Sequence, residues 1–459
     1  MNTQEMLDPK SWAEQTFGNV QLHDLRRTRR AVQAATSLAE NPLGSLPAQM
    51  QTWKETKALY RLLDKPDVTF AGLMQPHLQQ TREQANASPV ILLVQDTTDI
   101  DLSHRRKISG VGQIGNERGR GFFVQTVLAV RPEIREVLGC MAQEPFVRIP
   151  APSGEQRHQR LKREKRETDV WMRQVAVIGS PDPGCMWVHV GDRGADMFPF
   201  FDACRQTQTH FLVRAAQNRR VEENDEAMKY SLERARSWPS QQSRPFELEA
   251  RHGHKARSTQ LQLACGQMTL LPPRNEPRAS QEPLTVWVIR VWEEQAPEGE
   301  EPLEWVLLTS VPTTTLEQAW ERADWYRHRW LVEDYHQCLK SGCRIEERQL
   351  QSVDGLMRLL GLLSPLAVRL LQVRERARQE PERLATEVIE PLMLAVLAER
   401  SGHSPATMTL GTFWTEVARL GGYLARSHDG PPGWRTIWKG WLDLQTLLEG
   451  VHLAFHLRL

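Results

Sequence analysis

Several patterns that would assign a function at once are missing from this sequence. The six cysteines include no CxxC pair and none of the paired spacings of a zinc site, so reduced thiols and no disulfide framework are expected. No GxxxxGK[ST] loop is present, which leaves ATP-driven chemistry without a binding motif. The polar start of the chain lacks a signal-peptide pattern, and the longest apolar stretch, 356–373, is interrupted by Arg358, Pro365 and Arg369. No membrane segment is therefore predicted.

An excess of charge of one sign is lacking too, because the 459 residues carry a formal net charge of only +1. The cations are nevertheless unevenly placed: residues 26–30 read RRTRR, and QRHQRLKREKR at 156–166 is strongly basic. Local basic patches on a neutral chain fit a protein that holds a polyanion at chosen places. Solvated helix faces are the alternative explanation of either run.

Hydrophobic spacing divides the chain into a helical start, a strand-rich middle and a helical end. Residues 8–70 have helix-like spacing, and apolar, β-branched runs predict strands at VILLVQD, FFVQTVLAV and MWVHV. Many prolines and strand-like runs predict a β-rich insertion over 215–312. A helix is expected to begin near Leu316, and 350–459 is again helical.

Two weaker motifs do not carry a function. Gly110, Gly112 and Gly115 match GxGxxG, but their flanks do not read as the strand and helix of a dinucleotide fingerprint, so no nucleotide cofactor is predicted. The surrounding arginines suit either a loop that closes over a phosphate backbone or a plain solvated loop. His252 and His254 have no acid or cysteine at ligand spacing nearby, so they are not predicted to bind metal.

The segment WYRHRWLVEDYHQCLKSG has a regular spacing of polar side chains. Tyr326, Arg329, Glu333 and Lys340 are separated by steps of three, four and seven. On one helix these steps bring the four side chains within about 60° of one another. This spacing predicts a functional face, although an ordinary ion pair between Arg329 and Glu333 at i,i+4 would also produce part of it.

Three acids stand where they could meet in one site. Asp96 and Asp192 each end a predicted strand, and Glu333 lies on the predicted helix face. Carboxylate oxygens are hard ligands suited to Mg²⁺ or Mn²⁺, and phosphodiester cleavage by two metal ions needs a few such acids from different elements. A role of the two aspartates as turn or helix-cap residues is the alternative.

The blocks QDTT, GDRGAD and Y-x2-R-x3-E-x6-K, in this order, resemble the catalytic blocks of the bacterial cut-and-paste DDE transposases of the insertion-sequence-four family. Further similar stretches include LHDLRRTRR, LYRLLDKPDV, PLEWVLLTS and ARLGGYLARS. The resemblance implies an α/β fold, with an RNase H-like catalytic core that carries a β-rich insertion, flanked by an N-terminal all-helical DNA-binding domain and a C-terminal helical dimerisation region. The implied boundaries are 1–70, 71–379 with the insertion at 215–312, and 380–459.

The resemblance also implies roles for individual residues. Asp96, Asp192 and Glu333 are implied to be catalytic acids that bind two Mg²⁺ ions, with Mn²⁺ as a substitute. The residues implied to contact DNA near the cut are Tyr326, Arg329, Lys340, Trp305 and Arg214, and those implied to contact the transposon end are Arg26, Arg27, Arg30 and Arg61. Trp305 matches an aromatic that stacks on a flipped base. Because Trp305 also begins an apolar run, a place in the core is its alternative.

The implied activity is excision and insertion of DNA. A homodimer would hold two inverted-repeat ends of double-stranded DNA in the cytoplasm, cut them through a hairpin intermediate, and join the 3′-hydroxyls to target DNA. Two other functions are open: a catalytically silent end-binding protein or transposition inhibitor, and a metal-dependent nuclease without strand transfer. The sequence departs from the family at Gln337, where a basic residue is expected, in 343–349, which carries one extra residue, and over 376–410.

Overall fold

The chain forms two compact units. The computed structural model describes residues 8–457 apart from 116–117, 151, 153, 157–158, 160–165, 223–227, 249–256, 275, 277, 298 and 427–428. A helical unit comprises Met1–Gln80, Ile100–Val111 and Asp334–Leu459, and a sheet unit comprises Thr81–Asp99 and Gly112–Glu333. The predicted domain boundaries at 70 and 379 do not coincide with the limits of these two units, and they stay predictions.

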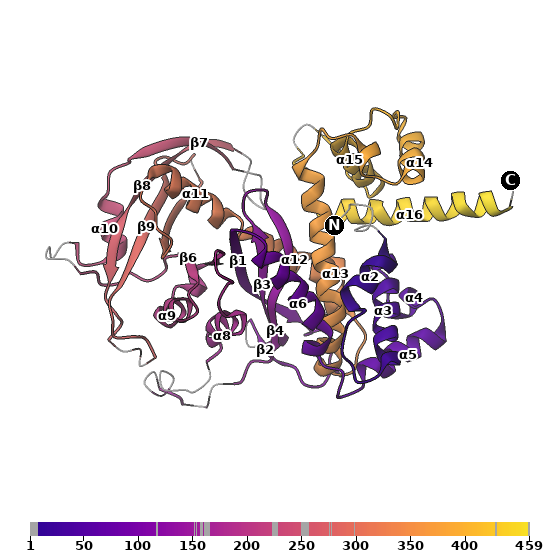
Figure 1. Cartoon of the computed structure of the whole chain (residues 1–459), viewed down its shortest axis with the longest axis horizontal. Coiled ribbons are helices and arrows are strands. Elements are labelled where there is room, and N and C mark those ends of the chain that lie inside the picture. Colours follow the sequence, from indigo (N-terminus) through magenta and orange to yellow (C-terminus); the bar gives the residue numbers. More distant parts are fainter. Residues whose placement is uncertain are drawn as a thin grey trace. The chain divides into compact units, whose positions relative to one another are not determined.

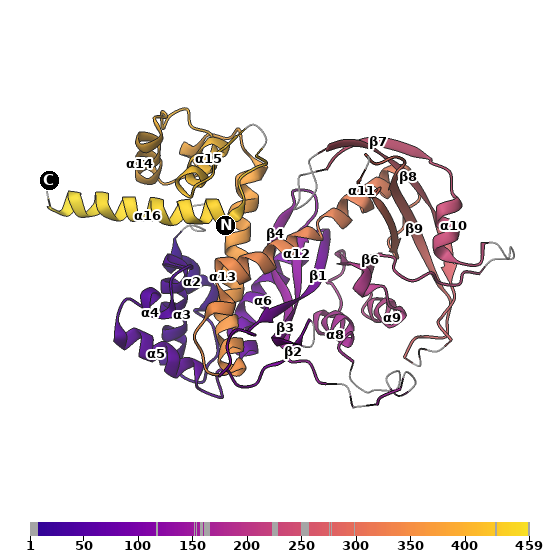
Figure 2. The same ribbon diagram turned by 180° about the vertical axis from the view of Figure 1, so that it is seen from behind.

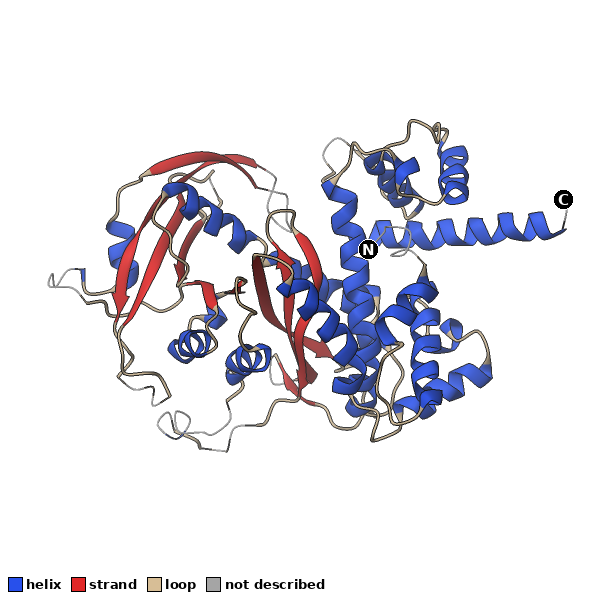
Figure 3. Cartoon of the chain, in the orientation of Figure 1, coloured by secondary structure: helices blue, strands red, loops and turns tan. Residues whose placement is uncertain are grey.

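The helical unit consists of helices and loops, apart from the last two residues of the first strand (Figure 3). Its α-helices are α2 Pro9–Phe17, α3 Leu25–Glu40, α4 Leu46–Gln49, α5 Trp53–Leu63, the start of α6 Phe70–Asn86, α13 Val353–Gln379, α14 Pro391–Ser401, α15 Leu410–Leu420 and α16 Trp434–Leu457. Asp8, Asp24 and Thr52 start α2, α3 and α5, because each side chain accepts a hydrogen bond from a backbone N–H of the first turn. The helical regions predicted at 8–70 and 350–459 are confirmed.

The longest apolar stretch of the sequence, 356–373, lies in α13. The segment Val353–Glu375 is long and apolar enough to cross a membrane by length and composition alone. However, 83% of its most apolar window is buried inside the protein, which is the pattern of a core helix.

The sheet unit contains all the strands and the helices between them. Its elements are β1 Val90–Asp101, β2 Gly112–Ile114, β3 Gly119–Arg131, β4 Glu136–Phe146, α8 Asp169–Ile178, β5 Met186–Gly191, the 3₁₀ turn η1 Arg193–Ala195, α9 Phe198–Gln206, β6 His210–Arg214, α10 Ser231–Ser237, β7 Gln242–Leu248, β8 Arg257–Leu270, β9 Leu284–Glu293, β10 Glu304–Thr309, α11 Leu316–Arg327 and the start of α12 Trp330–Gln337. The strands predicted from apolar runs are confirmed.

The strands form one mixed ten-stranded sheet in the order β2-β3-β1-β5-β6-β10-β9-β8-β7, with β4 paired to β3 (Figure 1, and from behind in Figure 2). β5 pairs in parallel with both β1 and β6, whereas β2 with β3, β3 with β4, β6 with β10, and the strands from β7 to β10 pair antiparallel. The predicted β-rich insertion is confirmed, and its strands continue the central sheet because Leu307 of β10 pairs with Arg214 of β6. The expected mixed α/β core is therefore present.

The two faces of the sheet have different neighbours at β6. Phe211 and Val213 belong to a buried cluster with Phe200 and Phe201 of α9. Successive side chains of a strand point to opposite faces, so Arg214 lies on the other face. There the charge of Arg214 acts on Tyr326 of α11. At β6 the sheet thus carries an apolar face towards α9 and a charged side chain on the face of α11.

One predicted strand end is wrong. β1 does not stop at Asp96 but continues to Asp101. Its parallel pairing with β5 ends earlier, at Val94 opposite Val190. Asp96 therefore lies inside the strand, just beyond the end of this pairing.

We predict that Glu293 anchors the insertion strands. Its nearly buried carboxylate pairs with Arg257 and accepts a hydrogen bond from Thr259 (2.7 Å). Arg257 above all lowers the pKa of Glu293 from 4.5 to about 2. The pair therefore contributes stability above pH 4.5, and this contribution is lost as the pH falls through about 2. Glu293→Gln should lower the free energy of unfolding in urea at pH 7 by about 3 kcal/mol.

The neighbouring exposed Glu294→Gln is the matched control and should change stability by less than about 0.5 kcal/mol. Equal effects of the two substitutions would contradict an anchoring role of Glu293.

Candidate active site

The two aspartates lie at equivalent positions of two paired strands, just beyond the end of their pairing. The parallel register of β1 and β5 ends with Val94 opposite Val190. Asp96 lies two residues beyond Val94, and Asp192 lies two residues beyond Val190. Because neighbouring parallel strands advance together, the equal offset brings both carboxylates to the same end of the paired segment.

The charges of the site meet at Asp96. Burial, then the charge of Asp192, raise the pKa of Asp96 to about 7, and Glu333 adds to this effect. The backbone N–H of Thr97 and the guanidinium of Arg329 lower the same pKa. The three predicted acids and Arg329 therefore belong to one electrostatic cluster around Asp96.

Each of the three carboxylates accepts a hydrogen bond at one oxygen. The bonds run from Thr97 N to Asp96 Oδ1 (2.8 Å), from Gly194 N to Asp192 Oδ1 (2.7 Å) and from Arg329 Nη1 to Glu333 Oε1 (2.6 Å). The second oxygen of each has no hydrogen-bond partner in the described part of the chain. Each acid thus keeps one oxygen for a further ligand.

This donor set fits a hard divalent cation. Among the described residues, no three His, Cys, Asp or Glu side chains stand close enough to enclose an ion by themselves. Mg²⁺ does not require such an enclosure, because it usually keeps several waters and is held by one or two carboxylates together with substrate phosphates. Carboxylate oxygens with one free position each are suited to that mode of binding.

The turn after β5 fixes Asp192. A Cβ at Gly191 would lie 2.5 Å from the Cβ of Ala195 and 3.1 Å from the ring of Trp171, so only glycine fits there. Asp192 is the N-cap of η1 through its bond from Gly194. The alternative that Asp192 is a cap residue is therefore correct for Oδ1. The second oxygen, Oδ2, takes no part in the cap.

The second aspartate of GDRGAD anchors the loop. Asp196 is almost fully buried and accepts hydrogen bonds from the backbone N–H groups of Ala216 (2.7 Å) and Gln217 (2.8 Å). It also forms an ion pair with the buried Arg219 (2.8 Å). These bonds tie the turn that carries Asp192 to the chain beyond β6.

The segment that carries Glu333 is two helices rather than one. The ring Nδ1 of His328 lies 2.9 Å from the carbonyl oxygen of Asp324, which a continuing helix would use for the N–H of His328. That N–H instead bonds to Trp325 O (3.1 Å), and Arg329 N bonds to Tyr326 O (3.0 Å). The chain therefore tightens at 328–329 between α11 and α12. The prediction of one helix face for this segment is wrong, although the helix start near Leu316 is confirmed by the capping box of Thr315.

Arg329 is a buried cation at this junction. It is only 8% exposed, and its guanidinium lies 4.7 Å from the ring of Trp330 and 5.9 Å from that of Tyr326. Burial alone would lower the pKa of Arg329, but Tyr326 and Glu333 outweigh it, and the net shift is upward. The side chain therefore carries its charge beside the acids, and the predicted i,i+4 pair with Glu333 is part of the site.

Three aromatic rings continue the site along the sheet. The ring of Trp305 lies 5.6 Å from that of Tyr326 and 6.4 Å from that of Phe246, both edge-on. Trp305 is half-buried, so it is neither a core residue nor a free one. Burial raises the pKa of Tyr326, and the cations Arg329 and Arg214 oppose this rise. Both predicted cations of the sheet unit therefore flank the phenol.

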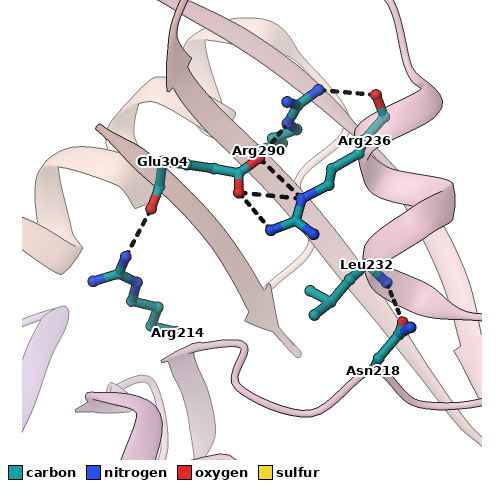
Figure 4. A network of polar contacts seen from close by, with 6 residues as sticks. All are labelled: Arg214, Asn218, Leu232, Arg236, Arg290 and Glu304. Atoms are coloured by element: carbon teal, nitrogen blue, oxygen red, sulfur yellow. Dashed lines mark hydrogen bonds and ion pairs between the residues drawn. The ribbon is translucent and has the colours of Figure 1, made fainter. Parts of the chain in front are cut away.

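Arg214 and Trp305 are held by a polar network at the start of β10 (Figure 4). Arg214 Nη2 donates to the carbonyl oxygen of Glu304 (2.8 Å), the residue before Trp305. The carboxylate of Glu304 accepts from Arg236 (2.6 Å) and Arg290 (3.0 Å), and Arg290 also donates to the carbonyl oxygen of Arg236 (3.0 Å). This network fixes the strand that carries Trp305.

Lys340 and the departures from the family lie in the helical unit. Lys340 sits in the π turn η3 Cys338–Gly342, with its Nζ 3.7 Å from Glu346. Gln337 is exposed at the end of α12. In the segment 343–349, Arg348 donates to the carbonyl oxygens of Pro42 and Gly44. That segment is therefore tied to the turn between α3 and α4.

The N-terminal arginines differ in what they contact. Arg26 pairs with Asp24 (3.0 Å) but is 87% exposed at its side chain, and Arg61 is exposed on α5. Arg27 pairs with Asp67 and is mostly buried, and Arg30 is bonded within its own helix. Arg26 and Arg61 are thus the most accessible of the four, whereas Arg27 is used in the fold.

Arg193 is a residue that the sequence reasoning missed. It follows Asp192 directly, is exposed, and lowers the pKa of Arg214 by its charge. Its place inside GDRGAD, between an acid and a glycine, was the available signal. His252, His254 and most of the basic run 156–166 lie outside the described residues.

Two models of known protein families match parts of this chain. Residues 9–68 match the model of the transposase DNA-binding domain, which includes all four predicted N-terminal arginines. Residues 188–369 match the model of the transposase DDE domain, which includes Asp192 and Glu333. The chain therefore joins a helical DNA-binding region to an α/β core of the RNase H-like DDE type and is, in class, a DNA transposase. DDE transposase domains generally use divalent metal ions.

We predict that Asp96 makes the metal-free protein sensitive to pH. Because the pKa of Asp96 is raised from 3.8 to about 7, its contribution to stability is present below pH 3.8 and is lost as the pH rises through about 7. In the presence of a chelator, the free energy of unfolding of the wild type should fall between pH 4 and pH 8. In Asp96→Asn this fall should be smaller by about 1–3 kcal/mol. Urea denaturation at both pH values measures this difference.

Magnesium at pH 8 should then raise the denaturation midpoint of the wild type but not that of Asp96→Asn. The exposed Asp443→Asn is the control and should behave as wild type in both tests. A pH response of Asp96→Asn equal to the wild type would refute this role of the carboxyl.

Proposed function

We propose that this chain is a Mg²⁺-dependent cut-and-paste transposase of the insertion-sequence-four family, which works with two ions per site and accepts Mn²⁺ as a substitute. The observation that carries the proposal is the convergence of Asp96, Asp192 and Glu333 around the buried Arg329. Such a cluster, in a chain that also has a transposase DNA-binding domain, suits the cutting and joining of phosphodiesters at chosen DNA ends.

The acids and the cations divide the work. Asp96, Asp192 and Glu333 would hold the ions through their free oxygens. The ions, when bound, activate the attacking oxygen and stabilise the leaving one. Arg329 offers a charged N–H fork to a phosphate oxygen beside the scissile bond, because its guanidinium stays charged next to the acids. Arg193, exposed next to Asp192, is a second phosphate contact of this kind.

The proposed reaction has four steps. Water attacks one strand at the transposon end and releases a 3′-hydroxyl, which then attacks the opposite strand and closes a hairpin. A second hydrolysis opens the hairpin, and the 3′-hydroxyl attacks a target phosphodiester. Hairpin formation needs a base to leave the stack, and the half-buried Trp305, packed against Tyr326, offers a ring for it. Arg214 and Tyr326 would contact the adjacent backbone.

The rest of the chain would bind and pair the ends. We propose that Arg26, Arg27, Arg30 and Arg61 contact inverted-repeat DNA, with Arg26 and Arg61 the more exposed of them. Lys340 would hold a phosphate near the cut, and the helices of 380–459 would pair two DNA-bound subunits into a homodimer. The protein would act in the bacterial cytoplasm on nucleoid DNA.

We expect Asp192→Asn to abolish cleavage. On DNA that contains the transposon end, nicking in Mg²⁺ should fall at least about 10³-fold, because the substitution removes one of the acids that hold the metal. End binding, followed by gel shift, should stay near wild type. The exposed Asp443→Asn is the control. Nicking by Asp192→Asn at a rate near that of wild type would make the catalytic assignment wrong.

The same assay separates the alternatives. A silent end-binding protein or inhibitor would shift the DNA without nicking it, and a nuclease would nick it without joined products. A transposase gives hairpins and then strand-transfer products with a target plasmid.

Arg61→Ala should weaken binding to end DNA by removing one cation from the contact. The slope of log affinity against log salt should decrease by about one counterion, and affinity at low salt should fall several-fold. Arg400→Ala, an exposed arginine of α14, is the matched control. An unchanged salt slope for Arg61→Ala would remove Arg61 from the DNA contacts.

A further inference from the structure

A row of buried polar side chains lies behind Asp96. Gln95, Gln125 and His189 are each 0% exposed and come from the neighbouring strands β1, β3 and β5. Polar groups at this depth are costly unless they satisfy one another. The proposed reaction uses none of the three, and their positions call for a separate explanation.

The row is connected to the carboxylate by hydrogen bonds. The bonds run from Thr97 Oγ1 to Gln125 Oε1, from Gln125 Nε2 to Gln95 Oε1 (3.3 Å) and from Gln95 Nε2 to His189 Nδ1 (3.4 Å). Thr97 also donates its backbone N–H to Asp96 Oδ1 (2.8 Å). The hydroxyl and the N–H of one residue therefore link the row to the acid.

The bonds of the row run in one sense. Because the amide nitrogen of Gln125 donates to the carbonyl oxygen of Gln95, the amide nitrogen of Gln95 is turned to His189. Burial lowers the pKa of His189 to about 3, so its ring is neutral, and Nδ1 accepts in the tautomer that carries the proton on Nε2. The buried Nε2 has no hydrogen-bond partner among the described residues, so the row ends at His189.

We propose that this row is the outer shell of the metal site and that Gln125 is a positioning residue, which holds Thr97 so that the carboxylate of Asp96 stays turned towards Asp192. The inference rests on the proposed function only in taking Asp96 as a metal ligand.

The physical reason is the repulsion between the two aspartates. Two carboxylates brought to the same end of paired strands tend to turn apart when no cation lies between them. The backbone N–H of Thr97 opposes this for Asp96 by holding Oδ1, and the hydroxyl of the same residue is held by Gln125. Loss of a residue that is hydrogen-bonded to a metal ligand, rather than to the metal, typically lowers metal affinity or activity about 10–100-fold.

The test compares two variants with their conservative partner. Thr97→Val keeps the shape of the side chain and removes its hydroxyl, Gln125→Leu removes the amide, and Thr97→Ser restores a hydroxyl. Binding of Mn²⁺ to the full chain without DNA is measured by electron paramagnetic resonance. The dissociation constant should rise about 10–100-fold in Thr97→Val and Gln125→Leu and return towards wild type in Thr97→Ser. In the cleavage assay, the half-saturating Mg²⁺ concentration should rise with the KM for DNA unchanged.

Thr126→Val is the matched control. It breaks the bond from Gln143 Nε2 to Thr126 Oγ1 (2.9 Å), a buried pair on β3 and β4 that is not one of the bonds of the row. It should lower stability and leave Mn²⁺ affinity unchanged. If Thr97→Val also leaves Mn²⁺ affinity unchanged, the row serves the fold alone and the inference is wrong; this pair decides even if Gln125→Leu does not fold.

The outcomes also separate this inference from the proposed function. A wild type that binds Mn²⁺ but does not cut end DNA, with weaker Mn²⁺ binding in Thr97→Val, would refute the transposase reaction and support the outer shell. A wild type that cuts end DNA, with unchanged Mn²⁺ binding in Thr97→Val, would support the transposase reaction and refute the outer shell.

Discussion

The site depends on one constraint, the parallel register of β1 and β5. It brings Asp96 and Asp192 to the same end of the sheet, where burial and like charge oppose the ionisation of Asp96. Other parts of the site offset this cost. The N–H groups of Thr97 and Gly194 each hold one carboxylate oxygen, and Arg329 brings a positive charge to the cluster. A divalent cation would complete the same compensation, which explains why hard oxygens are left free.

The break between α11 and α12 gives Arg329 its place. A continuous helix would keep Arg329 on a helical surface, whereas the tightened turn at 328–329 buries it between Tyr326, Trp330 and Glu333. In this position the guanidinium of Arg329 neutralises part of the negative charge of the acids. The pairing of Arg329 with Glu333 is thus compatible with both the structural and the functional interpretation of their spacing.

The sequence predicted what depends on local pattern. Apolar runs located the strands, and helix-like spacing placed a helix start near Leu316, because both signals lie within a few residues. It could not give the continuation of β1 past Asp96 or the break at His328, since each depends on a competing hydrogen bond or on a neighbouring strand. The partners Gln95 and His189 are 94 residues apart, so no spacing rule brings them together.

Basic runs also predict less than they suggest about where DNA binds. In RRTRR, Arg27 is committed to Asp67 and Arg30 to its own helix, whereas Arg26 is almost fully exposed. Arg348 is basic as well, yet it is buried and bonded to backbone carbonyls. A chain with a net charge near zero must place its free cations selectively, because most arginines are occupied by carboxylates and carbonyls of the fold. The surface that holds DNA is therefore defined by which cations the fold leaves exposed and not by where the sequence is most basic.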